Sequence, residues 1–136
     1  MDGWNVRLIN SQALELGTVD SRALIVTARG AVTQSTPSVI TSVGSSTITA
    51  QNVAGNTDYD VTLENTSNDF QGDLILTAAN VNVKDTNAIV LGASTVSGNY
   101  ALTAGDAVTD SGNVTVGGNF SVTTVSYTHL TLPTQA

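Results

Sequence analysis

The sequence of 136 residues contains no cysteine, one histidine, two prolines and only four basic residues. The absence of cysteine excludes disulfides, thiolate nucleophiles and cysteine-ligated zinc. Eleven acidic residues against four basic ones give a formal net charge of −7. Phosphate backbones and anionic membrane surfaces should therefore repel the protein, and we expect no nucleic acid partner.

Long hydrophobic runs and aromatic residues are also scarce. No run of eighteen apolar residues occurs, so we expect no membrane insertion. The start, MDGWNVRLIN, lacks the basic and then apolar order of a signal peptide. Although only 4% of residues are aromatic, 36 are Leu, Ile, Val or Phe, above the level expected of a disordered chain. The 21 Thr and 17 Val favour β-strands.

The last twelve residues differ in style from the rest. Residues 125–134 read VSYTHLTLPT, which resembles a translation of the transposase adapter used in short-read sequencing libraries. Gln135 and Ala136 do not fit the adapter. We interpret residues 125–136, with the only histidine, His129, as an artefactual tail and exclude them from fold reasoning. We accordingly expect the natural protein to continue past Thr124 and to begin before Met1.

Short runs with aliphatic outer residues and a polar middle residue recur along residues 1–124. Examples are Val6–Leu8, Val61–Leu63, Val81–Val83 and Val114–Val116. This period of two is typical of short strands with one buried face. Gly, Asn, Asp and Ser separate the runs and favour turns.

A longer repeat is superimposed on these strands. Thr-Ala pairs follow aliphatic runs at residues 27, 49, 77 and 103, with Thr123-Thr124 as a fifth example, so the spacings are 22, 28, 26 and 20 residues. Residues 13–17 also correspond to 88–92, and residues 26–35 to 102–111, at offsets of 75 and 76. Periods of this size are typical of solenoids, propellers or arrays.

The strands favour a solenoid among these architectures. Three-residue strands are too short for stable hairpins, and Asn-Gly or Asp-Gly turns are absent between adjacent runs. Stacked coils would pair each strand with its equivalent in the next coil. We therefore predict an all-β fold, a parallel β-helix of about five coils over residues 1–124. Its pairs should lie 20–28 residues apart, with Thr27, Thr49, Thr77 and Thr103 in one column. An antiparallel sandwich would instead pair strands within about ten residues.

Several segments resemble the repeats of filamentous-haemagglutinin-like bacterial exoproteins. They are residues 68–78, 88–92, 96–104 and 112–120, and the resemblance covers about residues 5–124. It implies a right-handed β-helical shaft, an outer-membrane export partner, and attachment to ligands on host or neighbouring-cell surfaces. A secreted or cell-surface location follows from the same resemblance.

The densest acidic stretch consists of Asp58, Asp60, Glu64, Asp69 and Asp73. Carboxylates so close in sequence could bind Ca²⁺ or serve as the acid and base of a carbohydrate-active β-helix enzyme. We favour solvated turn and strand-end residues, because no Lys or Arg lies within ten residues and the calcium-binding nonapeptide repeat is absent. An enzyme should gather these residues in one groove, whereas a shaft should scatter them.

Other candidate residues indicate structure more than chemistry. Gly117-Gly118 is typical of a turn, Lys84 has the outward parity of a solvated charge, and Tyr100 shares the parity of Leu102 and should lie in the core. Trp4 and Tyr59 could stack on sugars. Without a native histidine or a lysine beside a Ser or Thr, no nucleophile is activated. We expect no catalytic residue, no cofactor and no metal site.

The sequence thus predicts a non-catalytic structural and adhesive shaft segment of a secreted or surface-displayed bacterial adhesin. Two alternatives remain open. One is a fragment of a carbohydrate-active β-helix enzyme that uses the Asp58–Asp73 stretch. The other is a surface-layer array module, built from antiparallel sandwiches.

Overall fold

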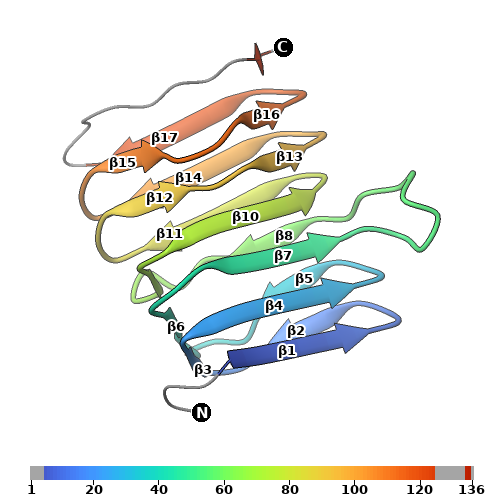
Figure 1. Cartoon of the computed structure of the whole chain (residues 1–136), viewed down its shortest axis with the longest axis horizontal. Helices are drawn as coiled ribbons and strands as arrows, with labels where there is room; N and C mark the ends of the chain where they lie inside the picture. Colours follow the sequence, from blue (N-terminus) through green and yellow to red (C-terminus); the bar gives the residue numbers. More distant parts are fainter. Residues whose placement is uncertain (1–4, 125–133, 136) are drawn as a thin grey trace.

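The computed structural model describes residues 5–124 and 134–135. These residues form short β-strands joined by turns, and they include no helix that could cross a membrane. The strands stack in parallel as a β-solenoid (Figure 1). The predicted all-β parallel β-helix is therefore confirmed. Residues 125–133 and 136, including His129, lie outside the described residues, so the interpretation of the tail remains a prediction.

Three sheets, here named A, B and C, form the sides of the solenoid. Sheet A contains β1 (Asn5–Asn10), β4 (Ala23–Ala28), β7 (Ser46–Ala50), β10 (Asp73–Ala78), β12 (Ile89–Leu91), β13 (Ser94–Val96), β15 (Val108–Asp110), β16 (Val114–Val116) and β18 (Thr134–Gln135). Sheet B contains β2 (Leu14–Leu16), β5 (Val32–Gln34), β8 (Val61–Leu63), β11 (Val81–Asp85), β14 (Tyr100–Ala104) and β17 (Phe120–Thr124). Sheet C contains β3 (Val19–Ser21), β6 (Ile40–Ser42) and β9 (Asp69–Phe70).

The shape of the coil changes along the chain. In the first three coils the chain visits sheets A, B and C in turn, but sheet C ends at β9. From β10 onward the chain alternates between sheets A and B, and two short strands of sheet A, such as β12 and β13, replace one long strand. The later coils are therefore two-sided.

The solenoid has about six coils, one for each strand of sheet B, so the predicted number of five was one too low. The first coil escaped notice because Ile9-Asn10 stands where the second and third coils carry Thr-Ala. Residues paired in the parallel ladders lie from 17 apart, as in Asp73 with Val90, to 29 apart, as in Val32 with Val61. This range is slightly wider than the predicted 20–28.

The predicted threonine column exists, with one wrong member. Thr27 pairs with Thr49, and Thr49 pairs with Thr77. The column then continues through Thr95 to Thr115. Thr103 instead lies in β14 of sheet B, where it pairs with Lys84 and Thr123.

The 75-residue correspondence in the sequence also joins strands of different sheets. Residues 13–17 contain β2 of sheet B, whereas residues 88–92 contain β12 of sheet A. The same local pattern fits both sheets because strands of either sheet have one buried and one solvent-facing side. The sequence repeat therefore specifies strands and turns, but not the side of the coil.

The core is a single stack of inward-facing aliphatic residues. In β10, for example, Leu74, Leu76 and Ala78 are fully buried while the residues between them face outward. Burying one such Leu contributes about 1.5–3 kcal/mol. Tyr100 is also fully buried, as predicted, and its ring meets that of Phe120 edge to face at 5.0 Å. Each coil thus covers the apolar surface of the one before it.

The longest coil carries a loop, residues 51–60, that projects from the rod between β7 and β8 (Figure 1). An antiparallel bridge between Gln51 and Asp58 closes its base, where Gln51 Nε2 donates to Asp58 Oδ1 at 2.9 Å. Arg29 Nη1 from the previous coil donates to the carbonyl of Gln51 at 3.1 Å. All ladders between strands of the described chain are parallel, so the antiparallel sandwich geometry was wrong.

Candidate functional site

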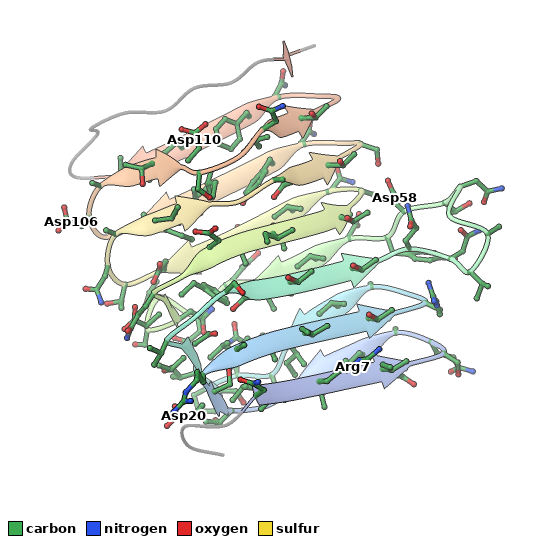
Figure 2. All side chains as sticks on the ribbon, viewed as in Figure 1. Arg7, Asp20, Asp58, Asp106 and Asp110 are labelled. Carbon is green, nitrogen blue, oxygen red and sulfur yellow. The ribbon has the colours of Figure 1, made fainter. Side chains whose placement is uncertain are left out.

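The five acidic residues singled out in the sequence occupy different parts of the solenoid. Asp58 lies in the projecting loop, well away from Asp106 and Asp110 in Figure 2. Asp60 directly precedes β8 of sheet B and Glu64 directly follows it, whereas Asp69 begins β9 of sheet C and Asp73 begins β10 of sheet A. Within the described residues, no group of three or more His, Asp or Glu could hold a metal ion.

Most of these carboxylates stabilise a neighbouring turn or strand. Asp60 Oδ1 accepts hydrogen bonds from the backbone and side-chain nitrogens of Asn80, at 3.1 and 3.2 Å. Glu64 Oε2 accepts from Asn82 Nδ2 at 2.7 Å, and Asp73 Oδ2 accepts from Ser111 Oγ at 3.0 Å. The bonds of Asp60 and Glu64 join successive coils, whereas the bond between Ser111 and Asp73 spans two coils.

Sequence reasoning missed the most unusual carboxylate, Asp85. It ends β11 on the inward side and is only 3% exposed, and its Oδ2 atom has no hydrogen-bond partner among the described residues. Burial, with a smaller contribution from the charge of Asp69, raises the pKa of Asp85 to about 7. The signal was present, because Val81, Val83 and Asp85 alternate at the same parity.

An asparagine ladder at the corner between sheets A and B was also missed. Asn80 Oδ1 accepts from the backbone N–H of Asn99 at 2.9 Å, and Asn99 Oδ1 accepts from that of Asn119 at 2.9 Å. Asp60 begins the same series. The spacings of 20, 19 and 20 residues, each just before a sheet B strand, were the signal that could have revealed this ladder.

The opposite ends of the sheet B strands border a groove. Two hollows of about 340 and 400 Å³ share Thr66 and together are lined by residues 34–37, 64–67, 84–86 and 103–105. We call this surface the corner groove. It runs along the axis past the turns that follow β5, β8, β11 and β14, and Figure 1 shows the turns after β11 and β14 along the left edge of the rod.

Buried hydrogen bonds support the wall of the corner groove. Asn68 is fully buried, and its Oδ1 accepts from Gln34 Nε2 at 2.7 Å and from the backbone N–H of Ile40 at 2.9 Å. Asn65 Nδ2 donates to the carbonyl of Ser38 at 2.6 Å. The polar side chains at this end of the groove are therefore held in place by hydrogen bonds within the chain.

The solvent-facing side of sheet A forms a second distinctive surface. Its threonine column consists of Thr27, Thr49, Thr77, Thr95 and Thr115, which occupy five successive coils. Parallel strands lie about 4.8 Å apart, so the hydroxyls and methyl groups repeat at that interval. Ile25 is 43% exposed on the same side of sheet A.

The remaining candidates have structural positions. Lys84 alternates with the buried residues of β11, in agreement with its outward parity, and Tyr59 is partly buried against the core. Gly117 and Gly118 form the turn before β17, where a Cβ on either would collide with residues 97–99 of the coil below. The prediction for Trp4 falls outside the described residues.

The parallel ladders, stacked coils and recurring turns define a β-solenoid repeat protein. The chain belongs to the family of repeats of unknown function (DUF5649), which matches residues 3–77 and again residues 78–136. The two matches begin 75 residues apart, the same spacing as the internal correspondence in the sequence. No curated protein and no solved structure matches the chain.

Proposed function

We propose that this chain is a non-catalytic structural and adhesive shaft segment of a secreted or surface-displayed bacterial adhesin of the filamentous-haemagglutinin-like kind. The observation that carries the proposal is the pairing of each coil with the next, since a repeat in sequence becomes a translation along one axis. Sheet B continues through six strands without interruption, and sheet A also has an unbroken path of strands from β1 to β18. Such an array can be lengthened by adding repeats, and each repeat contacts only its neighbours.

The surface chemistry supports the adhesive part of the proposal. The threonine column and the corner groove both extend over several coils, so a ligand array on a cell could meet many equivalent groups. Weak contacts of this kind add up when they are linked on one rigid support. The dispersal of the acidic residues over separate elements supports the non-catalytic part of the proposal.

Retention of protein-coated beads on cultured cells under flow tests this proposal. One set of beads carries the chain, and a matched set carries Val83→Asp, in which a charge replaces a fully buried core residue and the coil should not form. Circular dichroism measures whether the variant has lost its strand structure. We expect the folded chain to retain several times more beads than the variant or an uncoated surface. Equal retention on all three would overturn the adhesive proposal.

A further inference from the structure

We propose that the corner groove binds a neutral oligosaccharide that runs along the solenoid axis. This inference rests on the proposed adhesive function and names the ligand class for it. The groove passes four successive turns, after β5, β8, β11 and β14. At about 4.8 Å per coil, these turns span roughly 14 Å along the axis. An elongated ligand fits this shape better than a compact one.

The groups that line the groove match the chemistry of sugar hydroxyls. Thr66, Thr86 and Thr103 contribute hydroxyls, which both donate and accept hydrogen bonds. Asn65 and Gln34 shape the wall with amides that are hydrogen-bonded within the chain, and the carboxylate of Glu64 only accepts. Because each sugar hydroxyl is both a donor and an acceptor, a wall with both functions can satisfy it.

The charge of the whole chain selects against acidic polymers. Glu64 and Lys84 bring opposite charges to the groove, while the buried Asp85, whose pKa is raised to about 7, is only partly ionised at neutral pH. The whole chain has a formal net charge of −7, so a sulfated or uronic polysaccharide would meet a repulsive field. A neutral chain pays no such penalty.

Backbone hydrogen bonding favours a sugar over an extended peptide. Peptides that bind along sheets pair with free N–H and carbonyl groups of an edge strand. In the corner groove the backbone N–H of Thr86 already donates to the carbonyl of Asn68 at 2.7 Å, and that of Gly105 donates to the carbonyl of Asp85 at 3.0 Å. These backbone groups of the turns are already paired with the neighbouring coil, so the groove offers a ligand mainly side chains.

The supporting network reduces the cost of binding. Gln34 and Asn65 are already held by Asn68 and by the carbonyl of Ser38, respectively. Side chains that are ordered before binding lose less conformational entropy when the ligand arrives. Weak but specific recognition, repeated along a longer shaft, would suit multivalent attachment.

Amide NMR titration of the ¹⁵N-labelled full chain tests the inference. The neutral probes are cellohexaose and chitohexaose, and the comparison probes are a heparin-derived hexasaccharide and an uncharged polar decapeptide. We expect saturable shifts from a neutral probe, confined to residues 34–37, 64–67, 84–86 and 103–105. Thr66→Val, which replaces a hydroxyl with a methyl group in an exposed turn, should weaken binding at least fivefold. Its matched control, Thr49→Val in the threonine column, should change affinity less than twofold.

Three outcomes would overturn the inference: no shifts with either neutral probe at millimolar concentration, shifts that Thr66→Val leaves unchanged, or groove binding by only the heparin fragment or the peptide. The bead assay separates this inference from the proposed function. Retention of beads by both the native chain and Thr66→Val, without oligosaccharide binding, would refute the groove and leave adhesion standing. Oligosaccharide binding without bead retention would refute adhesion and leave the groove as a binding site.

Discussion

The side-chain carbonyl of Asn99 accepts a hydrogen bond at 2.9 Å from the backbone N–H of Asn119, one coil further along the solenoid. The same relationship joins Asn80 to Asn99. At this corner the chain leaves sheet A for sheet B, and the asparagine satisfies a backbone donor of the next coil. The asparagine ladder thus links coils outside the regular strand pairing.

Replacing Asn99 with Ala should destabilise the protein by about 1 kcal/mol, because it removes the side-chain oxygen that accepts from the backbone N–H of Asn119. The bond from the backbone N–H of Asn99 to Asn80 Oδ1 would remain. Asn113→Ala is the matched control, since Asn113 is an exposed turn residue outside the ladder. Urea unfolding followed by circular dichroism measures both variants. Equal stability of the two variants would show that the ladder contributes nothing.

Asp85 should make the solenoid more stable in mild acid than at neutral pH. Its pKa is raised from 3.8 to about 7 in the folded state, so between these values the folded chain holds a proton that the unfolded chain has lost. Stability contributed by this proton is present at low pH and is lost as pH rises through about 7. The shift corresponds to an upper limit of roughly 4 kcal/mol.

Urea unfolding at pH 5 and pH 8.5 measures this effect. The variant Asp85→Asn keeps the size of the side chain but cannot ionise. Its unfolding free energy should therefore differ little between pH 5 and pH 8.5, and at pH 8.5 it should exceed that of the native chain. An equally steep pH dependence in Asp85→Asn would assign the effect to other groups.

Tyr100→Phe should leave stability unchanged or raise it by up to about 1 kcal/mol. Within the part of the chain that the structure describes, the Tyr100 hydroxyl is buried and has no hydrogen-bond partner, and a buried polar group without a partner is unfavourable. The same burial raises the pKa of the phenol. Tyr100→Ala, which also removes the ring that meets Phe120, should cost about 3–5 kcal/mol. Thermal unfolding distinguishes these cases, and a large loss in Tyr100→Phe would reveal a partner for the hydroxyl.

Shortening the projecting loop should be tolerated. Gln51 and Asp58 already form an antiparallel bridge, so Asn-Gly in place of residues 52–57 would close a two-residue hairpin. Val53 is 82% exposed, so removing it with the loop takes no side chain out of the core. We expect a change in unfolding free energy below about 1 kcal/mol. A collapse of the cooperative transition would mean that the loop is part of the folding unit.

The sequence allowed the strands, turns and stacking to be predicted because each depends on local chemistry. The alternation in Val81–Val83 correctly predicts that both valines are buried, and the parity of Tyr100 correctly predicts that its side chain faces the core. The side of the coil could not be predicted in the same way. Thr77-Ala78 and Thr103-Ala104 have the same local pattern, yet the first lies in sheet A and the second in sheet B.

The candidate surfaces were harder to predict because they form between coils. Thr66 and Thr86 come together in the corner groove only after the coil lengths are known, and those lengths vary with the projecting loop and with the end of sheet C. Asn80, Asn99 and Asn119 lie between strand runs, where asparagine is typical of a turn, so the sequence alone does not distinguish a turn from a ladder. Only their bonds to the next coil reveal the second role.

The stacking of successive coils can be measured directly by electron spin resonance distances between paired spin labels. The chain has no native cysteine, so double cysteine variants take labels only where intended. Thr27 and Thr95 lie three coils apart in the threonine column, and Thr27 and Thr115 lie four apart. The account predicts backbone separations of roughly 14 and 19 Å, differing by one strand spacing of about 4.8 Å. Equal or unordered distances for the two pairs would contradict the solenoid, and with it the shaft.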